Sequence, residues 1–170
     1  VSRMFSREAF RLLNGSFERV LEQSGNIEAR AATHLGAFYA GMAIEQSMLG
    51  AAHALANPLT AHYNITHGVA LAVLLPHVVR WNAADDSTLY QCFVTETLNG
   101  QADGESGNHL ATRLVEIGRR GGFPARLRDA GVAEDDLEKL AGAAGEQWTG
   151  TFNPRPFSSS GALEVYQCAY

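Results

Sequence analysis

The chain has 170 residues, of which 46% are hydrophobic and 18% are charged, as in an ordinary soluble globular domain. Lys and Arg number 13 against 18 Asp and Glu, so the formal net charge is −5 and no basic surface is available for nucleic acid. The most apolar stretch, Val69 to Val79, is too short to cross a bilayer and contains Pro76 and His77. We therefore expect no membrane span and a cytoplasmic location.

Two features concern the ends and the thiols of the chain. The sequence begins at Val1, already within a helical pattern, which we interpret as the start of a truncated protein. Cys92 and Cys168 are far apart and in no metal-binding or redox spacing. We expect both to be buried free thiols in a reducing compartment.

Apolar residues in the first part of the chain recur at steps of three and four, the period of amphipathic helices. The first predicted helix runs from Ser2 to Gln23, and its end is marked by Ser24-Gly25-Asn26. The second runs from Ile27 to Leu49 and is rich in alanine and glycine, which favours close approach to another helix.

Two prolines divide the next part. A short helix from Ala51 to Ala56 should end there, because Pro58 disfavours helical geometry at the residue before it. Thr66 can then cap a helix from His67 to Trp81, which Pro76 should bend.

The second half of the chain continues in the same way, without alternating strand patterns and without an internal repeat. The sequence therefore predicts an all-α fold, and we expect residues 1–170 to form a single domain. The remaining predicted helices are Leu89 to Leu98, Ser106 to Arg120, Glu134 to Ala144 and Gly161 to Ala169, with a break at Asn82 to Asp86 and loops at 99–107 and 145–160.

Four of the six histidines lie between positions 53 and 77. His53 lies on the predicted short helix and His67 on the first turn of the next, and the connecting loop from Asn57 to Thr66 can fold back to bring the two imidazoles together. A helix N-terminus disfavours protonation of His67, which keeps it in the form that binds metal. On spacing alone, ordinary hydrogen-bonded histidines remain an alternative to a metal site.

The sequence around these histidines is more specific. Residues 50–70 read GAAHALANPLTAHYNITHGVA, and residues 74–82 read LLPHVVRWN. They resemble group III (iron-type) alcohol dehydrogenases, in which a histidine of a G-x-x-H-x-x-x-H-x-L segment precedes one of a P-H-G segment by fourteen residues, as 53 precedes 67. The stretches RLRDAGV at 126–132, TGTFNPR at 149–155 and the residues from 164 to 170 resemble further family segments.

The resemblance implies the helical-bundle C-terminal domain of this family, related to that of dehydroquinate synthases. It also implies hydride transfer between a nicotinamide and a substrate polarised by divalent iron or zinc. His53 and His67 match the family's third and fourth metal ligands. Asn57 matches a histidine that lies near the nicotinamide, and an amide can orient a substrate there but cannot shuttle protons. The other histidines match no ligand, and we expect packing or solvent-facing roles for His34, His62, His77 and His109.

Other family elements have no match. The first two metal ligands of the family, an Asp and a His in a D-A-x-x-H segment, precede the first helix present here, and no aspartate occurs before Asp85. The nucleotide-binding domain is not matched either. We therefore expect weak binding of divalent iron or zinc at an incomplete site, no binding of NAD(P), no catalytic residue within this chain, and no hydride transfer by this chain alone.

Three functions are compatible with the sequence. The first is a truncated or split dehydrogenase that requires a separate nucleotide-binding chain. The second is a hydrolase that uses the remaining cleft, although no G-x-S-x-G motif occurs. The third is a non-catalytic helical module. For each, apolar surface left uncovered should favour a homo-oligomer.

Overall fold

The computed structural model describes residues 1–98, 100 and 102–170, and every regular element within them is a helix. The prediction of an all-α fold is confirmed. The α-helices are α1 (Ser2–Glu22), α2 (Ile27–Glu45), α3 (Ala51–Tyr63), α4 (His67–Ala83), α5 (Gln91–Thr97), α6 (Ser106–Arg120), α7 (Leu137–Gly145) and α8 (Ser159–Ala169), and the 3-10 helices are η1 (Arg128–Ala130), η2 (Glu134–Asp136) and η3 (Trp148–Phe152).

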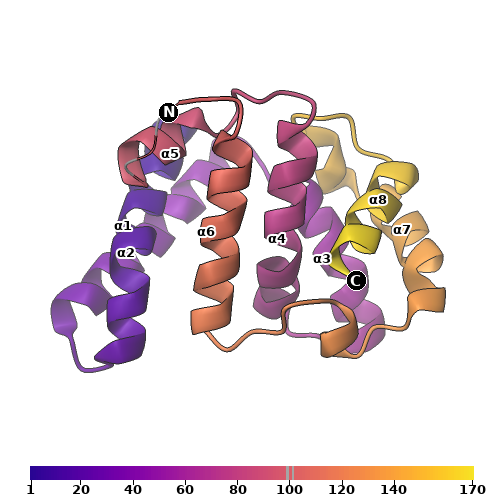
Figure 1. The fold of residues 1–170 in the computed structure, drawn as a ribbon, viewed down its shortest axis with the longest axis horizontal. Coiled ribbons are helices and arrows are strands. Elements are labelled where there is room, and N and C mark those ends of the chain that lie inside the picture. The colour runs from indigo at the N-terminus through magenta and orange to yellow at the C-terminus, as the bar shows by residue number, and fades with distance from the viewer. Residues whose placement is uncertain (99, 101) are drawn as a thin grey trace.

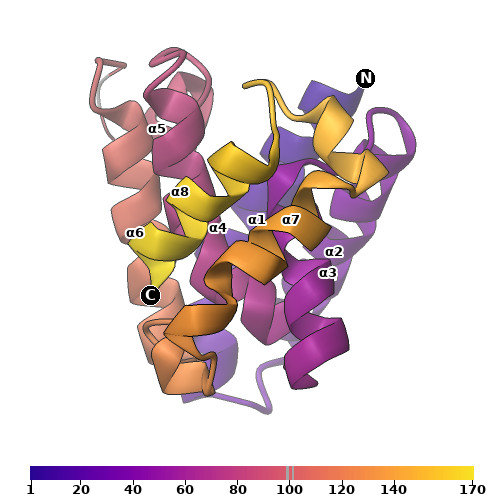
Figure 2. The same ribbon diagram turned by 90° about the vertical axis from the view of Figure 1, so that its right-hand side faces the viewer.

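The helices are arranged along the longest axis of the molecule. Figure 1 shows α1 and α2 at one end, α6 and α4 in the middle, and α3, α7 and α8 at the other end. In the view turned by 90°, α3, α7 and α8 lie toward the viewer and α1 and α2 lie behind them (Figure 2). The middle helix α4 therefore has packing partners on two sides.

The main hydrophobic core lies between α3, α4, α7 and α8. Tyr166 of α8 is completely buried in it and donates a hydrogen bond from Oη to the carbonyl oxygen of Leu55 at 2.6 Å. Burial of a large side chain contributes roughly 2 kcal/mol, so Tyr166 helps to fix α8 against α3. Its largest buried side chains, besides Tyr166, are Leu55, Leu59, Leu74, Leu127, Leu140 and Val165.

A second, smaller core joins α4 to α5 and α6. It is built from Val79, Val94, Leu110 and Ala111, with Phe10 of α1 packed against it. The Phe10 ring contacts the Phe93 ring edge-on, at 5.2 Å between centroids. This contact is one of the links between the α1–α2 pair and the rest of the molecule.

The pairing of α1 with α2 depends on small residues. A Cβ added at Gly36 would lie 2.9 Å from Leu13 Cγ and 3.2 Å from the carbonyl oxygen of Ala9, so only glycine allows this approach. The alanine- and glycine-rich sequence of α2 is thereby explained on the face toward α1. Its opposite face exposes the apolar side chains of Ile27, Leu35 and Phe38 beside polar ones such as His34 and Glu45.

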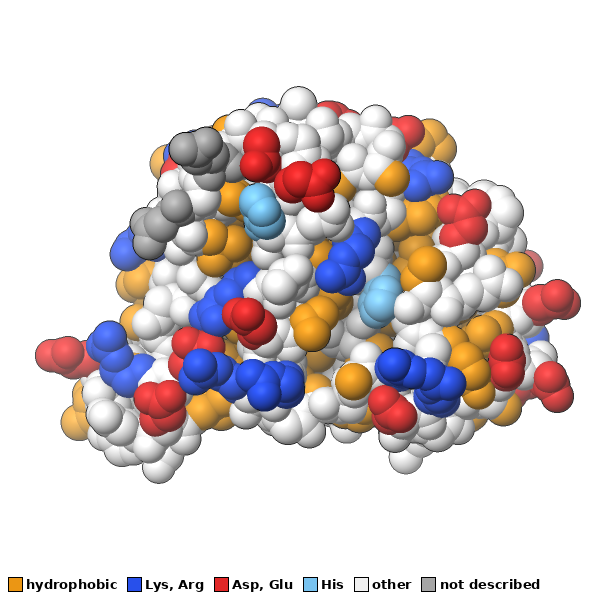
Figure 3. Space-filling model, in the orientation of Figure 1, with side chains coloured by type: hydrophobic (Ala, Val, Ile, Leu, Met, Phe, Trp, Pro, Cys, Tyr) orange, Lys and Arg blue, Asp and Glu red, His pale blue; other side chains and the backbone are white. Residues whose placement is uncertain are grey.

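Ion pairs join α6 to α1. Arg113 and Arg120 both reach Glu18, at 2.9 Å and 3.0 Å. On the face drawn in Figure 3, acidic and basic side chains lie beside one another near the lower edge. Since the pairs are partly exposed, each contributes at most about 1 kcal/mol.

The prediction that a helix ends at Ala56 is wrong. Helix α3 continues to Tyr63 with Pro58 inside it, and Pro58 is buried. A proline in a helix interior removes one hydrogen bond and disfavours the preceding turn. Here Leu55 and Leu59, which flank the proline, are both completely buried, and their packing outweighs that local cost.

Other predicted boundaries also shift. Helix α2 ends at Glu45 rather than Leu49, and Met48 then adopts a φ of 117°. Helix α4 continues through Asn82 into the predicted break, because the Asn82 side chain is buried and hydrogen-bonded. Thr66 occupies the N-cap position of α4 but makes no side-chain capping hydrogen bond.

The loop predicted at 99–107 gives way to α6 at Ser106, and its positions Asn99 and Gln101 lie outside the described residues. The loop predicted at 145–160 contains η3, and α8 begins within it at Ser159.

The expectation of two buried thiols is also wrong: both cysteines are free, but Cys92 is only partly buried and Cys168 is exposed, since α8 directs position 168 to solvent. Of the helices in the described part of the chain, none combines the length and the apolarity that crossing a membrane requires.

Candidate metal centre

His53 and His67 lie side by side. His53 is the third residue of α3 and His67 is the first residue of α4. The chain turns between the helices at Asn64, which adopts the left-handed conformation at the C-cap of α3. The ring centroids of the two imidazoles are 5.4 Å apart, with 46° between the ring planes. The segment between them thus folds back as predicted, although most of it is helical rather than a loop.

The surroundings of His53 favour its neutral form. Burial lowers the pKa of His53, and the neighbouring His67 lowers it further. A neutral imidazole carries the free lone pair that a metal ligand needs. The lowered pKa therefore favours the form of His53 that can bind a divalent cation.

The spacing of the rings fits two ligands of one ion. With metal–nitrogen bonds of about 2.1 Å and tetrahedral angles, two imidazoles on one ion have centroids about 5 Å apart, close to the spacing found here. Residues 1–98, 100 and 102–170 contain no group of three or more His, Cys, Asp or Glu that could hold a metal ion. His53 and His67 therefore fit half of a tetrahedral site.

Asn57 lies one helical turn after His53 and is held by a residue far along the chain. Its Nδ2 donates to Oε1 of Gln147 at 2.9 Å. No sequence pattern pointed to Gln147, because this contact spans 90 residues and depends on how η3 packs against α3. The amide that we expected near a nicotinamide is thus already oriented by the protein.

The segment η3 forms one border of the site. Gln147, just before it, contacts Asn57, and Asn153, just after it, accepts a hydrogen bond from the backbone N–H of Ala51 at 3.2 Å. His53 lies between these two contact points on α3. Two aromatic side chains of η3 are exposed and in edge-on contact: Trp148 at 60% and Phe152 at 51%, with centroids 5.9 Å apart.

Two hydroxyl groups near this border have no partner among the described residues: Thr60 and Thr149 have buried Oγ1 atoms without hydrogen bonds. Thr60 shares a helix face with His53 and Asn57, because positions 53, 57 and 60 follow the helical repeat. Unused donors and acceptors of this kind can serve a bound alcohol or water.

The remaining histidines lie apart from this pair. His34, His62 and His109 are exposed. His77 is partly buried, and burial lowers its pKa, with Arg80 lowering it further. The expected packing or solvent-facing roles agree with these positions.

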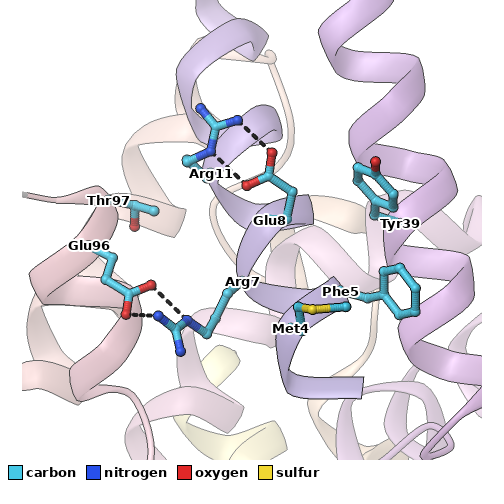
Figure 4. A pocket seen from close by; sticks show the side chains of 8 residues that line it. All are labelled: Met4, Phe5, Arg7, Glu8, Arg11, Tyr39, Glu96 and Thr97. Atoms are coloured by element: carbon cyan, nitrogen blue, oxygen red, sulfur yellow. Dashed lines mark hydrogen bonds and ion pairs between the residues drawn. The ribbon is translucent and has the colours of Figure 1, made fainter. Parts of the chain in front are cut away.

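A cavity of about 630 Å³ opens between α1, α2 and α5, and none of the histidines lines it. Figure 4 shows its charged side chains in pairs, with Arg7 directed at Glu96 and Arg11 at Glu8. Because the guanidinium groups are already neutralised by carboxylates, this cavity offers little to a charged ligand. The histidine pair remains the better candidate site.

Comparisons with known proteins identify the family of the chain. Residues 1–170 match the model of the C-terminal part of the Fe-containing alcohol dehydrogenase family. Lactaldehyde reductase of Escherichia coli (strain K12) is 34% identical over 151 residues, covering 86% of this chain and 39% of that protein. The 1,3-propanediol dehydrogenase of Citrobacter freundii is 30% identical over 166 residues, covering 96% of this chain and 43% of that protein.

A solved structure of a 1,3-propanediol oxidoreductase superimposes with a TM-score of 0.93 at 28% sequence identity, covering 100% of this chain and 45% of that one. The chain therefore spans about two-fifths of the length of the curated relatives it matches. The resemblance seen in the sequence is confirmed over the whole chain.

Proposed function

Because this chain belongs to the Fe-containing alcohol dehydrogenase family, within its C-terminal helical part, we propose that it is the metal-side domain of an NAD(P)-dependent alcohol dehydrogenase. The observation that carries the proposal is the pair of adjacent imidazoles, His53 and His67, with centroids 5.4 Å apart. The two histidines lie on the first turns of two packed helices, at a spacing that allows both to bind one divalent ion. This arrangement favours a shared metal site over two unrelated surface histidines.

Each residue of the site has a proposed role. His53 and His67 provide two nitrogen ligands for divalent iron or zinc. When bound, such an ion supplies a Lewis acid that polarises an alcohol or carbonyl oxygen. Asn57, held by Gln147, orients the substrate from the same helix face. The substrate class is an alcohol or the corresponding aldehyde.

The proposal also concerns the parts of the active site that this chain does not supply. The remaining two ligands and the nicotinamide site are proposed to lie outside these 170 residues, either in a separate nucleotide-binding chain or elsewhere in a longer protein. On its own, the chain should bind metal weakly and should not transfer hydride, because half of the ligands give low affinity for iron in particular.

Metal titration tests this function. Calorimetric titration with zinc, and with divalent iron under anaerobic conditions, should show binding that weakens at least about tenfold in His53→Ala and in His67→Ala. His62→Ala is the matched control, since His62 is exposed on the same helix and should leave the affinity unchanged.

Two outcomes of this titration would contradict the proposal, in whole or in part. Binding that is indifferent to both substitutions means that the pair is not the metal centre. Binding tighter than about micromolar that is lost in both variants keeps the centre but contradicts the half-site, because other residues must then complete it.

A second candidate function is assembly through helix α2. The observation that favours it is the exposed apolar face of α2, with Ile27 at 80% and Phe38 at 61% exposure. We propose on this ground that the chain forms a homo-oligomer.

A further inference from the structure

We propose that Asn153 is a positioning residue of the metal centre, which fixes His53 by capping the N-terminus of α3 from a distant part of the chain. This inference rests on the proposed function, because it assigns Asn153 a role in holding one of the two proposed ligands. Asn153 itself is not proposed to touch the metal or the substrate.

Helix α3 has no cap of its own. The N-cap position is Gly50, which has no side chain to accept a hydrogen bond from the first turn. The backbone N–H of Ala51 instead donates to Oδ1 of Asn153 at 3.2 Å, across 102 residues of sequence. Asn153 thus satisfies one of the backbone donors that every helix start leaves open.

Glycine at position 50 is what allows this approach. A Cβ added there would lie 3.2 Å from Oδ1 of Asn153, which is tighter than most Cβ contacts in proteins. The absence of a side chain at Gly50 therefore leaves room for the Asn153 side chain, whose Oδ1 is the acceptor for the first turn of α3.

The other end of the same amide is bound to α4. Nδ2 of Asn153 donates to Oδ1 of Asn82 at 2.7 Å and to the carbonyl oxygen of Arg155 at 2.8 Å. Asn82 is 3% exposed and lies in the last turn of α4, the helix that begins with His67. A single side chain thus connects the helices that carry the two imidazoles.

The loop that carries Asn153 is itself fixed. Arg155 donates from Nη1 to the carbonyl oxygen of Trp81 at 2.7 Å, and its guanidinium carbon lies 3.9 Å from the centroid of the Trp81 ring. Trp81 Nε1 in turn donates to Glu164 of α8 at 2.7 Å. The acceptor offered to α3 is therefore held in place before any metal binds.

The position of His53 makes this cap relevant to ligation. His53 is in the first turn of α3, the turn whose order depends on capping. If that turn loosens, the imidazole of His53 moves relative to His67, whose helix is fixed by the core. Residues that hold metal ligands in place commonly change metal affinity by about 10- to 100-fold when they are replaced.

The test compares three variants by zinc calorimetry. Asn153→Ala should weaken zinc binding at least about tenfold. Asn153→Asp keeps an oxygen that can accept from Ala51 but loses the bonds donated to Asn82 and Arg155, so it should recover only part of the affinity. Asn26→Ala is the matched control, because Asn26 caps α2 by accepting from the N–H of Ala29 at 3.0 Å and lies far from the histidines in sequence.

A readout without metal separates this inference from the proposed function. In the metal-free protein, the nuclear Overhauser effect between the imidazoles of His53 and His67 should weaken in Asn153→Ala, and the amide of Ala51 should exchange faster. If both changes occur, they support the positioning role of Asn153. If the parent protein also binds no zinc, the proposed metal function is contradicted independently of that role.

Several results overturn the inference. One is an unchanged Overhauser effect together with unchanged zinc affinity in Asn153→Ala. Another is an equal loss of zinc affinity in Asn26→Ala, which would show that general stability is being measured. If Asn153→Ala does not fold, Gly50→Ala replaces it, since its Cβ displaces the amide without removing it and should also weaken zinc binding.

Discussion

Burial lowers the pKa of His53 and of His77, and in both cases a neighbour lowers it further, His67 for the first and Arg80 for the second. In the unfolded chain a histidine titrates near pH 6.5. Between the lowered native pKa and this value, the unfolded state binds more protons than the native state. Stability is therefore complete above about pH 6.5 and is lost as the pH falls through this window.

This pH dependence is measurable by urea denaturation. The free energy of unfolding should fall as the pH is lowered below about 6.5, and His77→Asn should reduce the slope. His62→Ala should leave the slope unchanged, since His62 is exposed. A slope that is the same in His77→Asn and in the parent protein contradicts the assignment to His77.

At the same scale, sequence reasoning singled out the two adjacent histidines but not the distant residues that contact their helices. His53 and His67 follow from local spacing and from a family motif, because both histidines lie within one short segment. Gln147 and Asn153 act across 90 and 102 residues. Such contacts depend on packing of the whole chain, and nothing local to either residue specifies its partner.

At the scale of elements, two glycines of α2 should respond in opposite ways to the same substitution. Gly36→Ala should destabilise the protein by about 1–3 kcal/mol, because the new Cβ meets Leu13 and the backbone of Ala9. Gly41→Ala should stabilise it by up to about 1 kcal/mol, since space there is open and alanine is the better helix former. Equilibrium urea unfolding of the two variants measures both effects, and equal signs contradict the close packing of α1 on α2.

The helices themselves were largely predictable from periodicity, and α6 begins and ends at the predicted residues. The errors occur where packing overrides a local rule. Pro58 should end a helix by its own chemistry, but it lies between two buried leucines. Asn82 reads as a helix break, but it is drawn into α4 by hydrogen bonds to Asn153 and Tyr90. Neither partner is visible from the neighbouring sequence.

At the scale of the whole molecule, helix α2 packs mainly on α1, and its outer face exposes several large apolar side chains. Large apolar side chains that are exposed side by side on a helix are often covered by a partner. We therefore expect self-association, which sedimentation velocity should show as a concentration-dependent increase in sedimentation coefficient. The residues of this face are Ile27, Leu35 and Phe38, exposed to 80%, 44% and 61%.

Sedimentation velocity on two variants tests whether the outer face of α2 is the surface of association. Phe38→Glu should leave the protein monomeric, because a charge at the centre of the face must be desolvated for association. Phe152→Glu places the same charge on another exposed aromatic and should leave association intact. A parent protein that stays monomeric at every soluble concentration contradicts the proposal.

The prediction of the whole fold rested on two kinds of information. Periodicity alone indicated an all-α chain, whereas the arrangement of the helices came from the family resemblance, since the period of a helix does not specify its neighbours. The match over residues 1–170 confirms that step.

The long-range cap on α3 has a consequence for the order in which the protein is made and folded. Chain synthesis proceeds from the N-terminus, so α3 and α4 leave the ribosome well before residue 153 exists. Contacts between such distant positions also form late, because closing a long loop has an entropic cost. The first turn of α3 therefore stays uncapped until residue 153 has been made, and an ion that arrives before then would meet His53 on an uncapped turn. Metal loading should thus follow completion of the fold rather than guide it.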